Sequence, residues 1–111
     1  MKIIRGDTIL LSFIRLNSDG QPITSIADAV YFTVKRNYTT EDVILQKRLS
    51  DMTFDDETGK YAFAINPEDT DSLNYGKYVY DVEVIVGSYK KTIARGELEI
   101  TEEVTHVGNE V

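Results

Sequence analysis

The chain of 111 residues contains no cysteine and no tryptophan, only one histidine and only two prolines. Without cysteine it can have neither a disulfide framework nor thiolate chemistry. That absence leaves the redox compartment open and favours a protein assembled in the cytosol. The single histidine, His106, lies in the polar C-terminal stretch, so we expect no catalytic triad and no histidine-rich metal site.

Long apolar runs are absent as well. No stretch approaches the roughly 20 apolar residues that a membrane-spanning helix needs. The first residues, MKIIRGDTILLSF, resemble the start of a signal peptide, but Arg5 and Asp7 interrupt the apolar run and no small-residue cleavage site follows. We therefore expect neither a signal peptide nor a transmembrane segment.

Basic residues are outnumbered by acidic ones, 12 to 19, which gives a formal net charge of −7. Such a charge repels the phosphates of nucleic acids and anionic lipids, so we expect neither nucleic acid nor a membrane as a partner. Solubility alone accounts for the charge. With 41% hydrophobic and 28% charged residues, the composition is that of a globular domain.

Apolar and more polar residues alternate along much of the chain with a period of two. The segment VYFTVK at 30–35, for example, has an apolar residue at every second position. This alternation is typical of strands with one face on a core. About seven strands at such spacings indicate an all-β sandwich or barrel. The expected strands cover residues 2–5, 9–14, 30–35, 43–50, 60–65, 78–86 and 89–100.

Turn residues separate these strands. Asp55–Gly59 is expected to close a hairpin, and Gly87-Ser88 suits a two-residue hairpin loop. The last strand contains a break in parity, because Ile93 is odd whereas Leu98 and Ile100 are even. A bulge near Arg95-Gly96 would bring all three onto one face.

The stretch between the fifth and sixth alternating segments predicts a short helical turn over about residues 67–73. Asn66 is a suitable N-cap and Pro67 suits the first helical position. Glu68 and Asp69 favour the positive end of the helix dipole, and Leu73 is the apolar plug of the turn. The chain then enters a core strand at Tyr78.

The segment Asn74-Tyr75-Gly76-Lys77-Tyr78-Val79-Tyr80 resembles the immunoglobulin motif Asp-x-Gly-x-Tyr-x-Cys. The resemblance implies an immunoglobulin-like β-sandwich in which Tyr78 is the corner tyrosine, whose hydroxyl bonds to upstream backbone. Tyr80 stands in place of the cysteine, and Tyr31 or Phe32 must replace the missing tryptophan. We therefore interpret Asn66, Pro67, Leu73, Gly76 and Tyr78 as architectural residues.

Four longer phrases resemble those of small phage and prophage virion proteins, including the immunoglobulin-like N-terminal domain of baseplate upper proteins. They are RGDTILLSF (Arg5–Phe13), SDGQPI with AVYFTVKR (Ser18–Ile23, Ala29–Arg36), INPEDTDSLNYGKYVYDVEV (Ile65–Val84) and TIARGELEITEEVT (Thr92–Thr105). The resemblance implies a non-enzymatic structural role in a tail, baseplate or neck. The implied location is the virion, assembled in the bacterial host cytoplasm, with other virion proteins or a second copy as partners.

Other chemical readings of the sequence are weaker. Arg5-Gly6-Asp7 matches the integrin-binding tripeptide, but a glycine kink between two strands explains it better. The acids at Asp51 and Asp55–Glu57 lack the spacing of a calcium loop. The remaining acids lie in turns or on exposed strand faces, where no shielded pair for hydrolysis is expected. We expect no catalytic residue, no cofactor and no metal.

Two features leave a binding role open. Tyr31, Tyr38, Tyr75 and Tyr89 are either strand-forming residues or an aromatic platform for a glycan, which makes a carbohydrate- or cell-surface-binding module the alternative function. Lys90 and Lys91 are either a docking contact or protection of a strand edge.

The domain is expected to cover residues 1–100. Residues 101–111 form a C-terminal tail that contains Val104 and Val107. The tail is either frayed or adds to a neighbour's sheet as a partner-binding strand.

Overall fold

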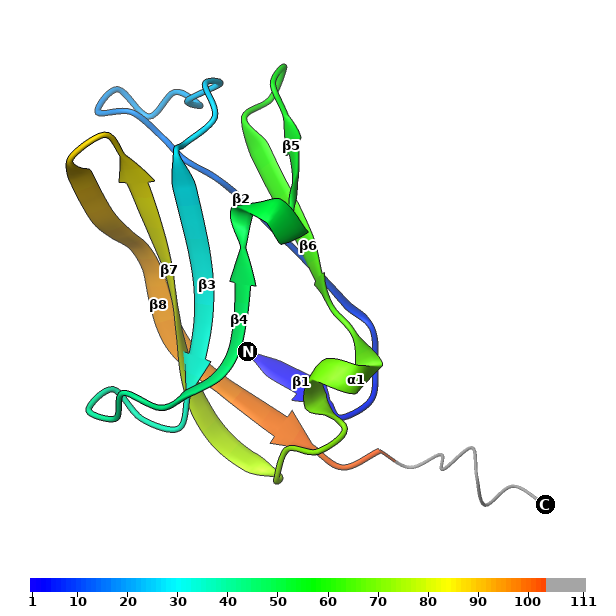
Figure 1. Ribbon diagram of the computed structural model, residues 1–111. Coiled ribbons are helices and arrows are strands. Elements are labelled where there is room, and N and C mark those ends of the chain that lie inside the picture. Colours follow the sequence, from blue (N-terminus) through cyan, green and yellow to red (C-terminus); the bar gives the residue numbers. More distant parts are fainter. Residues whose placement is uncertain (104–111) are drawn as a thin grey trace.

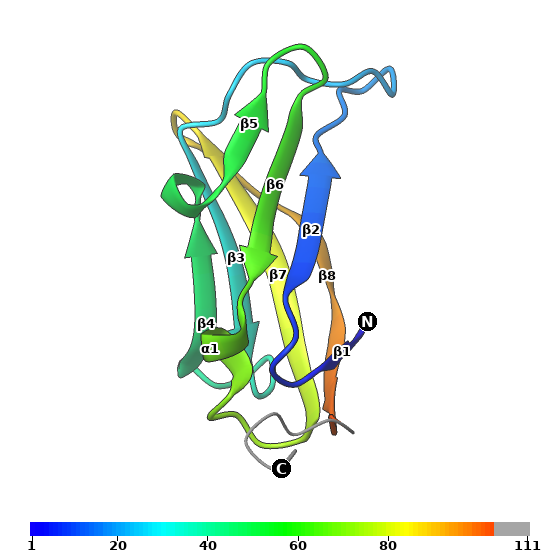
Figure 2. The same ribbon diagram turned by 90° about the vertical axis from the view of Figure 1, so that its right-hand side faces the viewer.

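The structure is a computed structural model that describes residues 1–103. Eight strands form two sheets that face each other, and a short α-helix and a single 3-10 turn complete the fold (Figures 1 and 2). Among the described residues, no helix has the length and apolar character needed to cross a membrane. The elements are β1 (Lys2–Ile4), β2 (Ile9–Ile14), β3 (Ala29–Lys35), β4 (Val43–Arg48), η1 (Leu49–Asp51), β5 (Thr53–Asp55), β6 (Lys60–Ile65), α1 (Pro67–Thr70), β7 (Gly76–Val86) and β8 (Tyr89–Thr101).

One sheet has five strands in the order β1-β8-β7-β3-β4, and the other has three in the order β2-β6-β5. All neighbours are antiparallel except β1, which runs parallel to β8. The expected immunoglobulin-like β-sandwich is confirmed, with two corrections to the strand list. Residues 1–103 form eight strands, and the sequence did not predict β5 because Thr53–Asp55 is too short to display alternation. One of the strand pairs is parallel.

The core lies where β3 and β7 of the large sheet face β6 of the small one. Every second residue of β3 is at most 1% exposed, namely Val30, Phe32 and Val34. Phe32 packs on Phe63 of the opposite sheet, with ring centroids 5.0 Å apart. Phe32 is therefore the aromatic residue that occupies the third-strand core position, whereas Tyr31 points to the other face of β3.

Tyr61 on β6 connects the core to the chain that leads into β3. It is 0% exposed, its ring stacks on Phe13 at 4.8 Å, and its hydroxyl accepts a hydrogen bond of 2.9 Å from the backbone N–H of Ala27. A buried hydroxyl must be paired in this way, because leaving it unpaired costs about 1–3 kcal/mol. Tyr61 thus ties the small sheet to the segment that enters the large one, in a chain that has no disulfide.

The bulge in the last strand lies earlier than expected. Val82 pairs with Ala94 and Glu83 pairs with Thr92, so Ile93 is the extra residue. The prediction of a bulge at Arg95-Gly96 was therefore wrong by two to three positions. Gly96 instead lies close to the Tyr80 side chain, since a Cβ there would be 3.1 Å from the hydroxyl oxygen of Tyr80.

The turn between β5 and β6 is held by the carboxylate of Asp55. Its Oδ1 accepts a 2.9 Å hydrogen bond from the backbone N–H of Glu57, and this bond is the main reason that the pKa of Asp55 lies below its ordinary value. Hydrogen bonds from Thr58 and the charge of Lys60 lower the pKa further, against a smaller desolvation effect. The ionised carboxylate therefore stabilises the turn.

The stabilisation by Asp55 is expected to disappear in acid. A group whose pKa is lower in the folded state stabilises above its unfolded pKa and stops doing so as the pH falls through its folded pKa. Asp55→Asn should therefore be less stable than wild type at pH 7, and the difference should shrink below the ordinary value of 3.8. Urea unfolding over this pH range measures it, with Asp56→Asn as the charge-matched control. A constant difference between neutral and acid pH would contradict the prediction.

Candidate docking surfaces

The helical turn expected before β7 is present, but its helix is shorter than expected. Pro67 is its first residue and Thr70 its last, with one further turn closed by the Leu73 N–H and the Thr70 carbonyl at 2.9 Å. At its start, the backbone N–H of Asn66 donates to the carboxylate of Asp69 at 2.7 Å. The same carboxylate lies 2.7 Å from Lys47 Nζ on β4, and both side chains are mostly buried. Asp69 thus fixes the turn to β4, the edge strand of the large sheet.

Tyr78 lies at the start of β7 and is 4% exposed. Its hydroxyl donates a hydrogen bond of 2.7 Å to the carbonyl oxygen of Asn74. Gly76, between them, has a φ of +129°, which only glycine adopts without strain. These residues fix the direction in which the chain enters the sheet, so their role here is structural.

Removal of the Tyr78 hydroxyl is expected to cost about 1 kcal/mol, because the Asn74 carbonyl would lose its donor in a half-buried position. Tyr78→Phe should therefore lower the urea midpoint of unfolding and leave its slope unchanged. Tyr80→Phe is the matched control, since no hydrogen bond joins the Tyr80 hydroxyl to the described residues. Equal losses of stability in the two variants would contradict this role for Tyr78.

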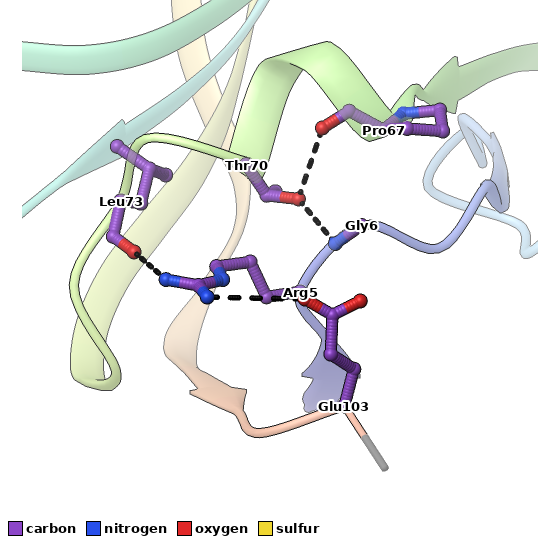
Figure 3. A network of polar contacts seen from close by, with 6 residues as sticks. All are labelled: Arg5, Gly6, Pro67, Thr70, Leu73 and Glu103. Atoms are coloured by element: carbon purple, nitrogen blue, oxygen red, sulfur yellow. Dashed lines mark hydrogen bonds and ion pairs between the residues drawn. The ribbon is translucent and has the colours of Figure 1, made fainter. Parts of the chain in front are cut away.

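The Arg5-Gly6-Asp7 tripeptide forms the turn that carries the chain from one sheet to the other. Figure 3 shows Arg5 and Gly6 directed at the segment around α1. The Gly6 N–H donates to the hydroxyl of the buried Thr70 at 3.0 Å, and Arg5 donates to the Leu73 carbonyl at 3.4 Å. The Arg5 guanidinium also lies 3.8 Å from the Glu103 carboxylate and 4.3 Å from the centre of the Tyr75 ring. Arg5 is thus engaged within the molecule, which supports the structural interpretation of the tripeptide.

The four candidate tyrosines do not share one surface. Tyr75 precedes β7 and Tyr89 follows it, so the two lie at opposite ends of an 11-residue strand (Figure 1). Tyr38, between β3 and β4, lies 4.2 Å from the guanidinium of Arg95. Tyr31 lies on the outer face of β3, near Arg48. No platform formed by all four rings is present.

The acidic residues of interest have structural partners as well. Asp51 accepts a 2.9 Å hydrogen bond from the backbone N–H of Arg48 and so closes the 3-10 turn. Within residues 1–103, no three histidine, cysteine, aspartate or glutamate side chains are grouped closely enough to hold a metal ion.

Lys90 and Lys91 point to opposite faces of β8. Lys90 lies 3.7 Å from the carboxylate of Glu83. Lys91 pairs with Val84, a core residue, so it projects from the face of the sheet that is directed toward β2 and β6. Val104 and Val107 lie outside the described residues. Thr101, at the expected start of the tail, belongs to β8 and its carbonyl accepts a 3.1 Å hydrogen bond from the N–H of Arg5.

One side of the sandwich is open. β2 is the edge of the small sheet, and beside it β8 lies near the edge of the large one (Figure 2). Between them is a groove of about 410 Å³. Sequence reasoning missed this groove. The core-facing positions in the first half of β8 gave a signal, since Lys91 and Ala94 there are not large and apolar. The groove is lined by Phe13, Leu16, Val82, Lys91, Ile93 and Ala94, among others.

The comparisons with known proteins give information about the fold alone. No family model matches the sequence, and no curated protein matches it. Among solved structures, the endo-beta-1,4-mannanase from Thermotoga petrophila is similar, with a TM-score of 0.59 and 10% sequence identity. The match covers 92% of this chain and 17% of the mannanase, so the chain spans about a sixth of that enzyme's length.

Proposed function

We propose that this chain is a non-enzymatic docking module in the tail, baseplate or neck of a phage or prophage virion. It would be assembled in the bacterial cytoplasm and bind other virion proteins or further copies of itself. The virion setting is supported by the four sequence phrases described above. Docking is supported by the incomplete cover of the sandwich, which leaves a groove between β2 and β8.

The single observation that carries the docking role is the exposed inner face of the first half of β8. Ala94 and Lys91 occupy positions that point toward the small sheet, yet both are exposed, because no strand of that sheet lies over them. A sheet face left without its second layer is a natural contact surface for another protein.

The virion role is tested by mass spectrometry of gradient-purified phage particles from an induced culture of the source strain. We expect peptides of this chain in the particle fraction, at a copy number per particle that fits a symmetric assembly. Particles that lack these peptides, while the chain is found in the soluble fraction, would overturn the virion role.

A carbohydrate-binding module is the second candidate, and the mannanase among the structural neighbours makes mannan the glycan to test. The dispersion of the four tyrosines argues against it, since glycans bind to aromatic side chains that share one surface. Affinity electrophoresis in gels containing soluble mannan distinguishes the two candidates. If mannan slows the wild-type chain but not Tyr38→Ala or Tyr75→Ala, the second candidate is supported. If the wild-type chain has the same mobility with and without mannan, docking remains the favoured function.

A further inference from the structure

We infer that the free edge of β2 receives an extended segment of a partner protein as a fourth strand of the small sheet. The segment would carry apolar side chains at alternate positions and at least one carboxylate. This inference rests on the proposed docking function and adds to it the surface and the chemistry of the partner. The structural basis has three parts: a free strand edge, an uncovered apolar face and unbalanced positive charge.

In the part of the chain that the structure describes, one edge of β2 has no strand beside it. β2 pairs with β6 from Ile9 to Ile14, and within residues 1–103 no strand pairs with its other side. Half of the backbone N–H and C=O groups of an edge strand point outward, where they can bind an added strand about 4.8 Å away. The docking edge therefore extends from Ile9 to Ile14, which is long enough to pair with a short strand.

The side chains beside this edge are packed on one side only. On β6, the core-facing residues Tyr61 and Ile65 are 0% exposed. On β2, the core-facing residues Leu11 and Phe13 are only partly buried, although they contact the same core. Residues of β2 are more exposed than those of β6 because β6 has a strand on both sides, whereas β2 has one only on the side of β6 among the described residues. An added strand would cover these side chains with its own inward-facing apolar residues.

The same strand would cover the bare part of β8. Figure 2 shows β2 and β8 along the same side of the molecule, one in each sheet. The groove between them reaches Val82 and Ala94 at its floor, and Ile93 at the bulge is half-buried. In a two-layer sandwich each sheet face is normally buried against the other. The five-stranded sheet therefore has room opposite β8 for one more strand beside β2.

The positive charge of the groove favours a partner segment that carries a negative charge. Its lining contains Arg15 and Lys91 but no carboxylate, although the chain as a whole carries a net charge of −7. Arg15 donates from Nη2 to the carbonyl of Ser25 at 2.9 Å, and its buried Nε has no hydrogen-bond partner among the described residues. The positive charges of Arg15 and of the exposed Lys91 in the lining both favour a carboxylate.

Selection from a displayed library of random peptides of about 12 residues, with the full chain as bait, tests the inference. Enriched peptides are expected to alternate apolar and polar residues and to contain an acidic residue. Added to the labelled chain, the most enriched peptide should shift the amide resonances of Ile9–Ile14. Absence of enrichment, or shifts confined to other strands, would overturn the inference.

Two charge reversals on adjacent residues provide the matched control. Lys91→Glu should weaken binding of that peptide by about tenfold or more, because it places a negative charge in the groove. Lys90→Glu makes the same charge change on the opposite face of β8 and should alter binding by less than about twofold. Equal weakening by the two variants would overturn the inference. The proposed function fails separately, if the chain is absent from purified particles.

Discussion

Gly59→Ala is expected to lower the free energy of unfolding by about 2–4 kcal/mol, through two effects at one residue. Gly59 has a φ of +78°, a left-handed conformation that costs an alanine about 1–2 kcal/mol. In addition, a Cβ at this position would overlap the backbone carbonyl oxygen of Ile23. Backbone cannot move aside as a flexible side chain can, so the β5-β6 hairpin and the segment around Ile23 would have to separate.

Gly20→Ala is the matched control for this prediction. Gly20 has the same φ of +78°, but a Cβ there would meet no atom within 4 Å. This variant should lose only the conformational part, about 1 kcal/mol. Urea unfolding of both variants separates the two effects. If Gly59→Ala and Gly20→Ala lose equal stability, the close approach between Gly59 and Ile23 does not matter for the fold.

Phe32→Ala should be the most damaging change, with an expected loss of about 3–5 kcal/mol. Phe32 is 1% exposed and lies between the rings of Phe63 and Tyr80, with centroid distances of 5.0 and 5.8 Å. Its removal leaves a cavity between the two sheets in a domain that has no disulfide to limit the loss. Thermal and urea unfolding should show a lower midpoint, because a typical domain has only about 5–15 kcal/mol of net stability.

Tyr31→Ala tests whether this loss depends on the face of the strand. Tyr31 is the neighbouring aromatic residue on β3, but it points away from the core and is half-buried near Arg48. Its replacement should cost about 1 kcal/mol, as is usual for a partly exposed side chain. A loss as large as that of Phe32→Ala would mean that the outer face of the large sheet is also packed against another layer.

Local patterns in the sequence were sufficient for most of the fold. Alternation predicted the strands that contain Phe32 and Tyr61, and the Asn66-Pro67 start predicted the helical turn before β7. Each of these predictions depends on residues within a few positions of each other, where periodicity and capping act directly. The sequence did not predict β5, because its three residues are too few to display a period of two.

The docking surface was less predictable, because it depends on which strands become neighbours. The sequence singled out Lys90 and Lys91 together as a basic pair. Only the pairing of Lys91 with Val84 shows which of the two lysines faces the inside of the sandwich. The role of Arg15 as the groove's other positive charge likewise required the contact between β2 and β8.

By itself, the sequence determined an all-β domain, the inward face of most strands and the position of its main turns, because these follow from local periodicity and backbone preference. Tertiary structure alone decided the parallel pairing of β1 with β8, the bulge at Ile93 and the approach of Gly59 to Ile23. It also decided that, among the strands of residues 1–103, β6 alone pairs with β2. These features join segments far apart in the chain, and the free energy of such contacts depends on how whole sheets pack, which no local pattern encodes.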